Sequence, residues 1–260
     1  MLLAIDVGNT QTVIGLYEKR RLRHMWRVAT NKVHTSDELR LKVNPLLESE
    51  NITVGDVTGA ALASVVPTLT SAWVVALKRL IGRDPVVCSA SSAQDLFEAC
   101  YANLLEIGAD RVADAVAARA LYGAPVVVVD FGTATNIEVI DKDGRFIGGV
   151  IAPGLETSAS ALFSHATKLA ATELVDPRTA IGGSTVQAIQ AGIVYGEADR
   201  VDGLLDRIFD QLGYTAPVVA TGGLAGRLVS VMRTPTRVNK ELTLEGLRLI
   251  HEAALGVQED

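Results

Sequence analysis

The stretch AIDVGNTQTVIGLY runs from Ala4 to Tyr17, and a similar stretch, VVDFGTATNIEVI, runs from Val128 to Ile140. In each, an apolar strand ends in Asp, one further residue and Gly, and a second apolar strand follows a few small polar residues. The Asp and the Gly recur at the same offset, which is close to half of the 260-residue chain. A repeat of this length predicts two similar half-molecules, each presenting its turn to a ligand.

The chemistry of the two turns favours phosphate as that ligand. Gly8 and Gly132 lack a Cβ, so the backbone can bend sharply and its N–H groups can approach a ligand. The carboxylates of Asp6 and Asp130 suit a hard cation such as Mg²⁺. An ordinary Asp-x-Gly hairpin is the alternative for one copy, but two copies in register argue against it. Hydroxyl and amide side chains that can donate to phosphate oxygens flank both glycines: Asn9, Thr10, Thr12, Thr133, Thr135 and Asn136.

Composition narrows the class of protein. The formal net charge is −6 and the isoelectric point about 5.3, and no run of Lys or Arg occurs, so we do not expect a nucleic-acid partner. Cys88 and Cys100 are the two cysteines, and their spacing indicates neither a disulfide scaffold nor a zinc site. A reducing cytoplasm fits this usage.

Neither a secretory signal nor a membrane span is expected. The chain reaches Asp6 after Met1 and four apolar residues, which is too short for a signal peptide. No later apolar run approaches the roughly 20 residues that a membrane helix needs. We therefore predict a cytoplasmic protein without a membrane partner.

Each half is predicted to contain three meandering strands followed by alternating helices and strands. The first half is predicted to have strands at 2–7, 12–18, 22–29, 58–65 and 85–88, with helices from Ser36 to about Glu50 and after Pro67. The second is predicted to have strands at 125–130, 135–141, 145–151 and 217–220, helices at 154–169 and 184–212, a surface loop at 172–183, and two helices ending at Leu255.

This layout is that of the ribonuclease H-like fold, and two copies make the actin/hexokinase-type ATPase fold. We thus predict an α/β protein of two mixed-sheet domains with a nucleotide in the cleft between them. The turn cluster at residues 122–125 precedes the second repeat, and we place the domains at residues 1–117 and 118–260.

Two glycine-containing segments carry further signals. PVVATGGLAG, at 217–226, allows the backbone to pass close to a flat ligand or a phosphate, although an ordinary strand-to-helix turn explains it almost as well. GADRVADAVAARA, at 108–120, opens a helix with Asp110 and Arg111. Asp110 there is favourable to the helix dipole without any function, whereas Arg111 is either a solvated side chain or a cation opposite an anion.

Together these motifs resemble type III pantothenate kinases. The motifs occur in one order along nearly the whole chain: DVGNT at 6–10, GADR at 108–111, DFGTAT at 130–135, GGVIAPG at 148–154 and TGGLA at 221–225. The resemblance implies a kinase that uses ATP to phosphorylate pantothenate in the first step of coenzyme A synthesis. It also implies Mg²⁺, a monovalent cation such as K⁺ or NH₄⁺, and a homodimer with pantothenate near the subunit interface.

The resemblance further implies roles for individual residues. Asp110 would accept the proton, Asp6 and Asp130 would bind the metal ions, with the monovalent cation at Asp130, and Thr133 would contact ATP. The ATP phosphates would be held by Asp6, Val7, Gly8, Asn9, Thr10, Gln11, Thr12 and Val13. Pantothenate would contact Tyr101, Gly108, Ala109, Asp110, Arg111 and Thr185.

Several positions depart from the family's usual pattern, and they bear on the shape of the pantothenate pocket more than on the chemistry. They are Gln11, Leu104, Asn136, Lys168-Leu169-Ala170 and Ser184.

Two other classes of function remain as alternatives. The first is a non-catalytic relative, but such a protein has no physical reason to keep the carboxylates of Asp6, Asp110 and Asp130 and the cation of Arg111 beside a cleft. Sugar kinases and acyl-phosphate kinases of the same fold are generally longer and lack GADR before the second repeat.

Overall fold

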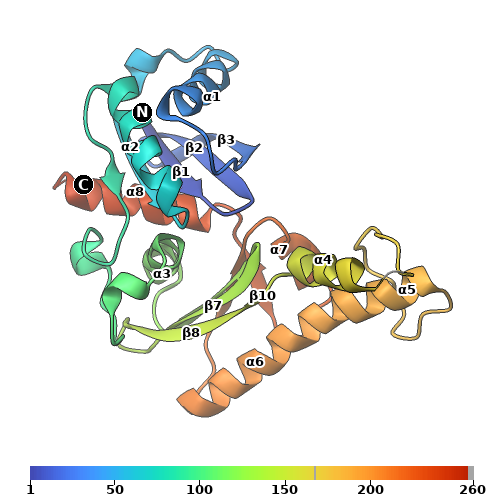
Figure 1. The fold of residues 1–260 in the computed structure, drawn as a ribbon. Helices are drawn as coiled ribbons and strands as arrows, with labels where there is room; N and C mark the ends of the chain where they lie inside the picture. The colour runs from blue at the N-terminus through green and yellow to red at the C-terminus, as the bar shows by residue number, and fades with distance from the viewer. Residues whose placement is uncertain (167, 257–260) are drawn as a thin grey trace. The chain divides into compact units, whose positions relative to one another are not determined.

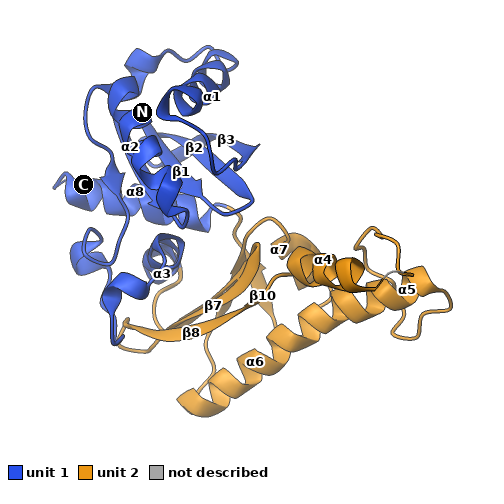
Figure 2. Ribbon diagram, in the orientation of Figure 1, with its two compact units in different colours: residues 1–121, 241–260 blue, residues 122–240 orange. Residues whose placement is uncertain are grey.

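The computed structural model describes residues 1–166 and 168–256, and the chain divides into two compact units (Figures 1 and 2). Unit 1 comprises residues 1–121 and 241–260, and unit 2 comprises residues 122–240. None of the helices in the described residues is long and apolar enough to cross a membrane.

Unit 1 is built on a five-stranded sheet in the order β3-β2-β1-β4-β5. The strands β1, β2 and β3 form an antiparallel meander, and β4 and β5 continue the sheet parallel to β1. The elements are β1 (Leu2–Val7), β2 (Gln11–Glu18), β3 (Arg21–Ala29), α1 (Ser36–Glu48), β4 (Gly59–Ser64), α2 (Pro67–Ile81), β5 (Val86–Val87), α3 (Ala109–Tyr122) and α8 (Leu242–Ala254), with short 3₁₀ turns at Val54–Asp56, Gln94–Leu96 and Leu104–Glu106.

Unit 2 repeats this topology in the order β10-β9-β6-β7-β8. Its first strand, β6, is again central, paired antiparallel with β7 and parallel with β9. The duplicated ribonuclease H-like fold is therefore confirmed. The elements are β6 (Val126–Phe131), β7 (Ala134–Ile140), β8 (Phe146–Pro153), α4 (Leu155–His165), α5 (Thr185–Gln190), a π-helical turn (Ala191–Tyr195), α6 (Gly196–Leu212), β9 (Val218–Thr221), α7 (Ala225–Val229) and β10 (Thr236–Val238).

Each unit has its own apolar core. In unit 1, Ile5 of β1 and Ile14 of β2 are fully buried in a cluster that also contains Trp73 of α2. In unit 2, Val129 of β6 packs in a cluster with Val201 of α6 and other residues of α6 and α7. Burial of whole strands on this scale contributes roughly 25 cal/mol per Å² of apolar surface. The two cores make each sheet a rigid support for the turns at its strand ends.

Local signals set several element ends. Thr35 and Glu38 form a capping box at the start of α1, in which the Thr35 N–H donates to Glu38 Oε2 over 2.8 Å. Pro67 opens α2, and Gly82, with φ of +74°, ends it. These signals explain why the helix starts were predictable to within a few residues.

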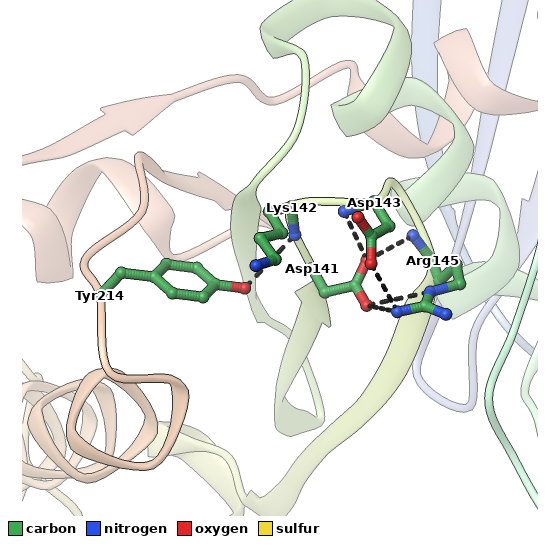
Figure 3. Close-up of polar contacts among 5 residues, drawn as sticks. All are labelled: Asp141, Lys142, Asp143, Arg145 and Tyr214. Carbon is green, nitrogen blue, oxygen red and sulfur yellow. Dashed lines mark hydrogen bonds and ion pairs between the residues drawn. The ribbon is translucent and has the colours of Figure 1, made fainter.

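The turn between β7 and β8 is organised by Asp141 (Figure 3). Its Oδ1 accepts from the backbone N–H groups of Asp143 and Arg145 at 3.0 and 2.9 Å, and its Oδ2 accepts from the Arg145 guanidinium. The Tyr214 hydroxyl accepts from the Lys142 N–H over 3.3 Å, which ties the connection after α6 to the same turn. Although burial raises the pKa of Asp141, these bonds lower it below the ordinary aspartate value.

The structure differs from the sequence prediction in four places. The helix expected at 154–169 ends at His165, the helix expected at 184–212 contains a π-helical turn, and β10 was not expected. The chain expected to continue the second domain to residue 260 instead returns, so that α8 packs on β1 and β4 of unit 1. β10 has three residues, too few to show an alternating pattern, and α8 is amphipathic whichever sheet it covers.

Candidate active site

The first turn lies at the carboxyl end of β1. Asp6 is half-buried there, in register with Val13 of β2, and the Gly8 N–H closes the turn by donating to Gln11 O over 3.0 Å. A Cβ at Gly8 would lie 2.9 Å from that oxygen, so the turn requires glycine. Asn9, Thr10 and Gln11 are exposed at the tip. The turn thus offers amide and hydroxyl groups to solvent beside a carboxylate.

The connection from β3 to α1 packs against this turn. The Thr30 N–H donates to Thr10 O over 2.9 Å, and the hydroxyls of Thr12 and Thr30 lie 2.8 Å apart. Thr12 is buried, so its hydroxyl holds the hairpin together rather than facing solvent. Lys32 reaches the tip, where its Nζ donates to Asn9 Oδ1 over 3.0 Å. Sequence reasoning missed Lys32, because only strand pairing brings residues 30–32 to the turn.

The GADR segment begins α3. The carboxylate of Asp110 is half-buried and accepts from the Arg111 backbone N–H over 2.8 Å. A Cβ at Gly108 would lie 2.5 Å from Asp110 Oδ1, so glycine leaves room for the carboxylate. Burial raises the pKa of Asp110 above the ordinary aspartate value, opposed by the Arg111 N–H and guanidinium. Arg111 itself is 6% exposed, so it is a buried cation and not a solvated one.

The first turn and the GADR segment meet at one edge of the unit 1 sheet. The Val65 N–H, just after β4, donates to Val7 O over 3.1 Å, and the Val65 side chain approaches the place that a Gly108 Cβ would occupy. Burial raises the pKa of the Cys88 thiol, and the charges of Asp110 and Asp6 raise it further. Parallel β1 and β4 bring their carboxyl ends together, which is where α/β sheets bind ligands.

The second turn is closed by glycines from three segments of unit 2. The Gly132 N–H donates to Ala134 O over 3.0 Å, and the Gly154 N–H donates to Thr133 O over 3.1 Å. A Cβ at Gly154 would lie 2.3 Å from Gly132 O, and one at Gly222 would lie 2.4 Å from Asp130 Oδ1. Gly222, with φ of +90°, is therefore needed for packing against the second turn.

A network of hydrogen bonds and one ion pair connects the two strand ends next to the second turn. The Thr135 hydroxyl donates to Glu197 Oε1, and Arg200 pairs with Glu197 Oε2 and donates to Pro153 O over 2.6 Å. Thr135 and Glu197 are 2% and 3% exposed. The network joins the start of β7 to the end of β8, and a carboxylate buried in this way requires such partners. Thr135 was expected to face phosphate, but its hydroxyl is held inside unit 2.

Tyr101 and Thr185, which are both predicted to contact pantothenate, are exposed in their own units. Tyr101 is 38% exposed and precedes the 3₁₀ turn at Leu104–Glu106 in unit 1. Thr185 is exposed at the start of α5, where Ser184 caps the helix by accepting from the Gln187 N–H over 3.3 Å. Figure 1 shows α5 beyond the strands of the unit 2 sheet.

Comparisons with known proteins agree on one family. A model of the type III pantothenate kinase family matches residues 2–207. The type III pantothenate kinase of Moorella thermoacetica is 42% identical over 97% of this chain and 99% of its own length, and that of Frankia alni is 45% identical over 97% and 99%.

Solved structures of more distant proteins share the fold. Component A of the (R)-2-hydroxyglutaryl-CoA dehydratase of Acidaminococcus fermentans aligns with a TM-score of 0.56 at 16% identity, covering 98% of both chains. An inorganic polyphosphate/ATP-glucomannokinase from Arthrobacter aligns with a TM-score of 0.50 at 15% identity, covering 99% of both. At such low identity these likenesses show the fold alone.

Proposed function

Since this chain belongs to the type III pantothenate kinase family and is a kinase that phosphorylates pantothenate in coenzyme A biosynthesis, we propose which of its residues carry out that reaction. We propose that ATP donates its γ-phosphoryl group to the primary hydroxyl of pantothenate, giving 4'-phosphopantothenate. The observation that carries the assignment is that Asp6 and Asp110 meet at one edge of the unit 1 sheet, where the first turn and a half-buried carboxylate lie together.

The first turn is the proposed binding segment for the ATP phosphates. Within residues 6–13, Asn9, Thr10 and Gln11 present exposed amide and hydroxyl groups beside Gly8, and backbone N–H groups are effective donors to phosphate oxygens. Thr133, exposed at the matching turn of unit 2, is the proposed further contact to ATP. Because Thr133 O is held by the N–H of Gly154 and the hydroxyl of Thr157, the position of this residue is well defined.

Asp110 is the proposed proton acceptor. An ordinary aspartate, with a pKa of about 3.9, is a weak base toward an alcohol. Burial raises the pKa of Asp110 and so strengthens it as a base. Phosphoryl transfer passes through a loose transition state, so the carboxylate chiefly orients the hydroxyl as its oxygen attacks phosphorus. The buried Arg111 guanidinium beside it suits the carboxylate of pantothenate.

The strand-end carboxylates fit two different cations. The described residues contain no group of three or more His, Cys, Asp or Glu that could hold a metal ion. Mg²⁺ in kinases is commonly bound by one or two carboxylates together with phosphates and waters, so Asp6 alone suffices as the protein ligand. When bound, Mg²⁺ neutralises charge on the phosphates.

Asp130 suits the monovalent cation, K⁺ or NH₄⁺. Gly222 packs closely against Asp130 Oδ1 and the Phe131 carbonyl oxygen, since a Cβ there would lie 2.4 and 2.5 Å from them, so these two oxygens lie near one another. A carboxylate and a backbone carbonyl at one small site are the oxygen ligands that such a cation takes.

A homodimer is proposed to complete the pantothenate site, which Tyr101, residues 108–111 and Thr185 would line. Around Thr185, the side chains of Ile181 and Val186 are 87% and 48% exposed. Gly192 and Gly196 are exposed and one helical turn apart, and a Cβ at either would meet nothing within 4 Å in this chain. Glycine costs a helix about 1 kcal/mol relative to alanine, and close packing of a second copy would explain its use.

A cytoplasmic location is also proposed. Cys88 and Cys100 are both free thiols, as expected in a reducing compartment.

One assay tests the proposed function. The purified protein is incubated with ATP, Mg²⁺ and K⁺, and the release of ADP is compared with pantothenate, glucose, acetate and no acceptor. We expect ADP release that depends on pantothenate, with the phosphate on its primary hydroxyl by phosphorus NMR. ADP release with glucose or acetate alone would instead assign the site to another kinase of this fold.

A further inference from the structure

The segment that joins β3 to α1 carries a lysine onto the tip of the first turn. Lys32 Nζ donates to Asn9 Oδ1 over 3.0 Å, although the two residues are separated by the whole β2–β3 hairpin in sequence. Both side chains are exposed. A solvent-facing ammonium group therefore stands beside the turn to which the ATP phosphates are assigned.

The backbone around Lys32 is fixed on both sides. On the side of β3, the Thr30 N–H donates to Thr10 O over 2.9 Å. Around the lysine, the Val33 N–H donates to Asn31 Oδ1 over 3.3 Å, and the Thr68 hydroxyl donates to Lys32 O over 3.5 Å. The capping box of Thr35 then begins α1. A lysine on such a connection starts from a defined place, so less entropy is lost when it binds a ligand.

The partner of Lys32 does not account for its charge. Asn9 supplies a neutral amide oxygen, and in the described part of the chain no carboxylate lies within ion-pair distance of Lys32. By contrast, Lys78 of the same unit pairs with Asp84 at 2.9 Å. A single exposed hydrogen bond to an amide adds little to stability. The Lys32 ammonium group is therefore available to bind an anion, and its hydrogen bond to Asn9 orients the side chain.

We propose that Lys32 is a further phosphate-binding residue of this kinase, its ammonium group oriented by Asn9 to bind the phosphate oxygens of ATP. This inference rests on the proposed ATP site at residues 6–13. The chain carries a net charge of −6, so a polyanionic nucleotide needs local positive potential. Lysine supplies it as a compact, mobile point charge.

Binding of nucleotides to the full-length protein tests this role. The affinities for ATP and for adenosine are measured by calorimetry at several salt concentrations, for the wild type, Lys32→Met, Lys32→Arg and Lys78→Met. We expect Lys32→Met to lower the affinity for ATP about tenfold, the usual effect of losing one charged hydrogen bond. The affinity for adenosine should not change, because adenosine has no phosphate, and the salt dependence for ATP should become shallower.

The other variants separate this role from a general effect of charge. Lys32→Arg should keep most of the affinity for ATP, and Lys78→Met, which removes the same charge from an exposed position of α2, should match the wild type. Equal ATP affinity and salt dependence in Lys32→Met and Lys78→Met would overturn the inference. If Asp6→Asn then still impairs ATP-dependent turnover, the proposed function stands without Lys32. If Asp6→Asn has no effect either, the ATP site itself is wrongly placed.

Discussion

Burial of Asp110, the proposed proton acceptor, lowers the stability of the folded protein when the carboxylate is ionised. Because burial raises its pKa in the folded protein, ionisation is less favourable there than in the unfolded chain. The folded state therefore binds the proton more tightly, and stability falls as pH rises from the ordinary aspartate pKa of about 3.9 to the raised value. Above that value the cost is constant, and the same carboxylate is ionised for catalysis.

We predict that Asp110→Asn lowers turnover by about 10² to 10⁴ while ATP binding is kept. The free energy of unfolding at pH 7 should rise, because the amide still accepts from the Arg111 N–H without carrying a charge. Urea denaturation at pH 7 and pH 3 checks this, and the gain should shrink in acid. Undiminished turnover would remove Asp110 from the mechanism.

Asp130 leads to a prediction about salt. If its carboxylate and the Phe131 carbonyl hold a K⁺ ion, replacing K⁺ by Na⁺ at constant ionic strength should lower the initial rate, because the smaller ion fits the same oxygens less well. Gly222→Ala, which would place a Cβ 2.4 Å from Asp130 Oδ1, should weaken the response to K⁺. Equal rates in the two salts would argue against a specific monovalent site.

Asp141 gives the opposite pH dependence to Asp110. Its pKa is lowered in the folded protein, so its carboxylate stabilises the fold above the ordinary aspartate pKa, and this stability is lost as pH falls through the lowered pKa. Asp141→Asn should therefore destabilise the protein at pH 7 and make little difference in strong acid. Asp143→Asn supplies the control, because Asp143 is exposed and forms an ion pair with Arg145. Thermal denaturation should show that this substitution lowers the free energy of unfolding by less than about 1 kcal/mol.

At the scale of elements, Gly246 of α8 lies close to the backbone of α3. A Cβ at Gly246 would lie 1.9 Å from the Ala113 carbonyl oxygen, so any larger residue must push the two helices apart. We predict that Gly246→Ala destabilises the protein by about 1 to 3 kcal/mol, the usual range for overpacking, despite the better helix propensity of alanine.

The matched control is Gly226→Ala in α7, whose added Cβ would meet only the Lys240 side chain at 3.8 Å. This variant should be neutral or slightly more stable. Urea denaturation of both variants measures the difference. A Gly246→Ala protein as stable as Gly226→Ala would show that the contact between the helices yields easily.

Elements with strong local signals were predictable, and those set by packing were not. The capping box at Thr35 and the apolar runs that form β1 and β6 place these elements within a residue or two of the expected bounds. β10 exists because Thr236–Val238 pair with Val218–Ala220, a contact that leaves no pattern in three residues. The loop expected at 172–183 has no helix or strand in the described residues, so this prediction is confirmed.

At the scale of the whole molecule, the exposed glycines before and within α6 predict a dimer. Gly196→Leu would fill the surface on which a second copy is proposed to pack, so we expect a shift from dimer to monomer in analytical ultracentrifugation and a higher KM for pantothenate. Ser71→Leu, which adds the same side chain to an exposed position of α2, should leave the dimer intact. A wild-type protein that sediments as a monomer would contradict the proposed dimer.

The amino-acid sequence by itself determined the duplication, the two Asp-x-Gly turns and the family, because periodicity, turn chemistry and motif order are all carried by residues that are neighbours along the chain. Only the tertiary structure decided that α8 belongs to unit 1, that Thr12 and Thr135 turn their hydroxyls inward, and that Lys32 stands over Asn9. Such contacts follow from strand pairing and from the burial of whole faces. Their free energy is shared among many distant residues, so no short stretch of sequence encodes them.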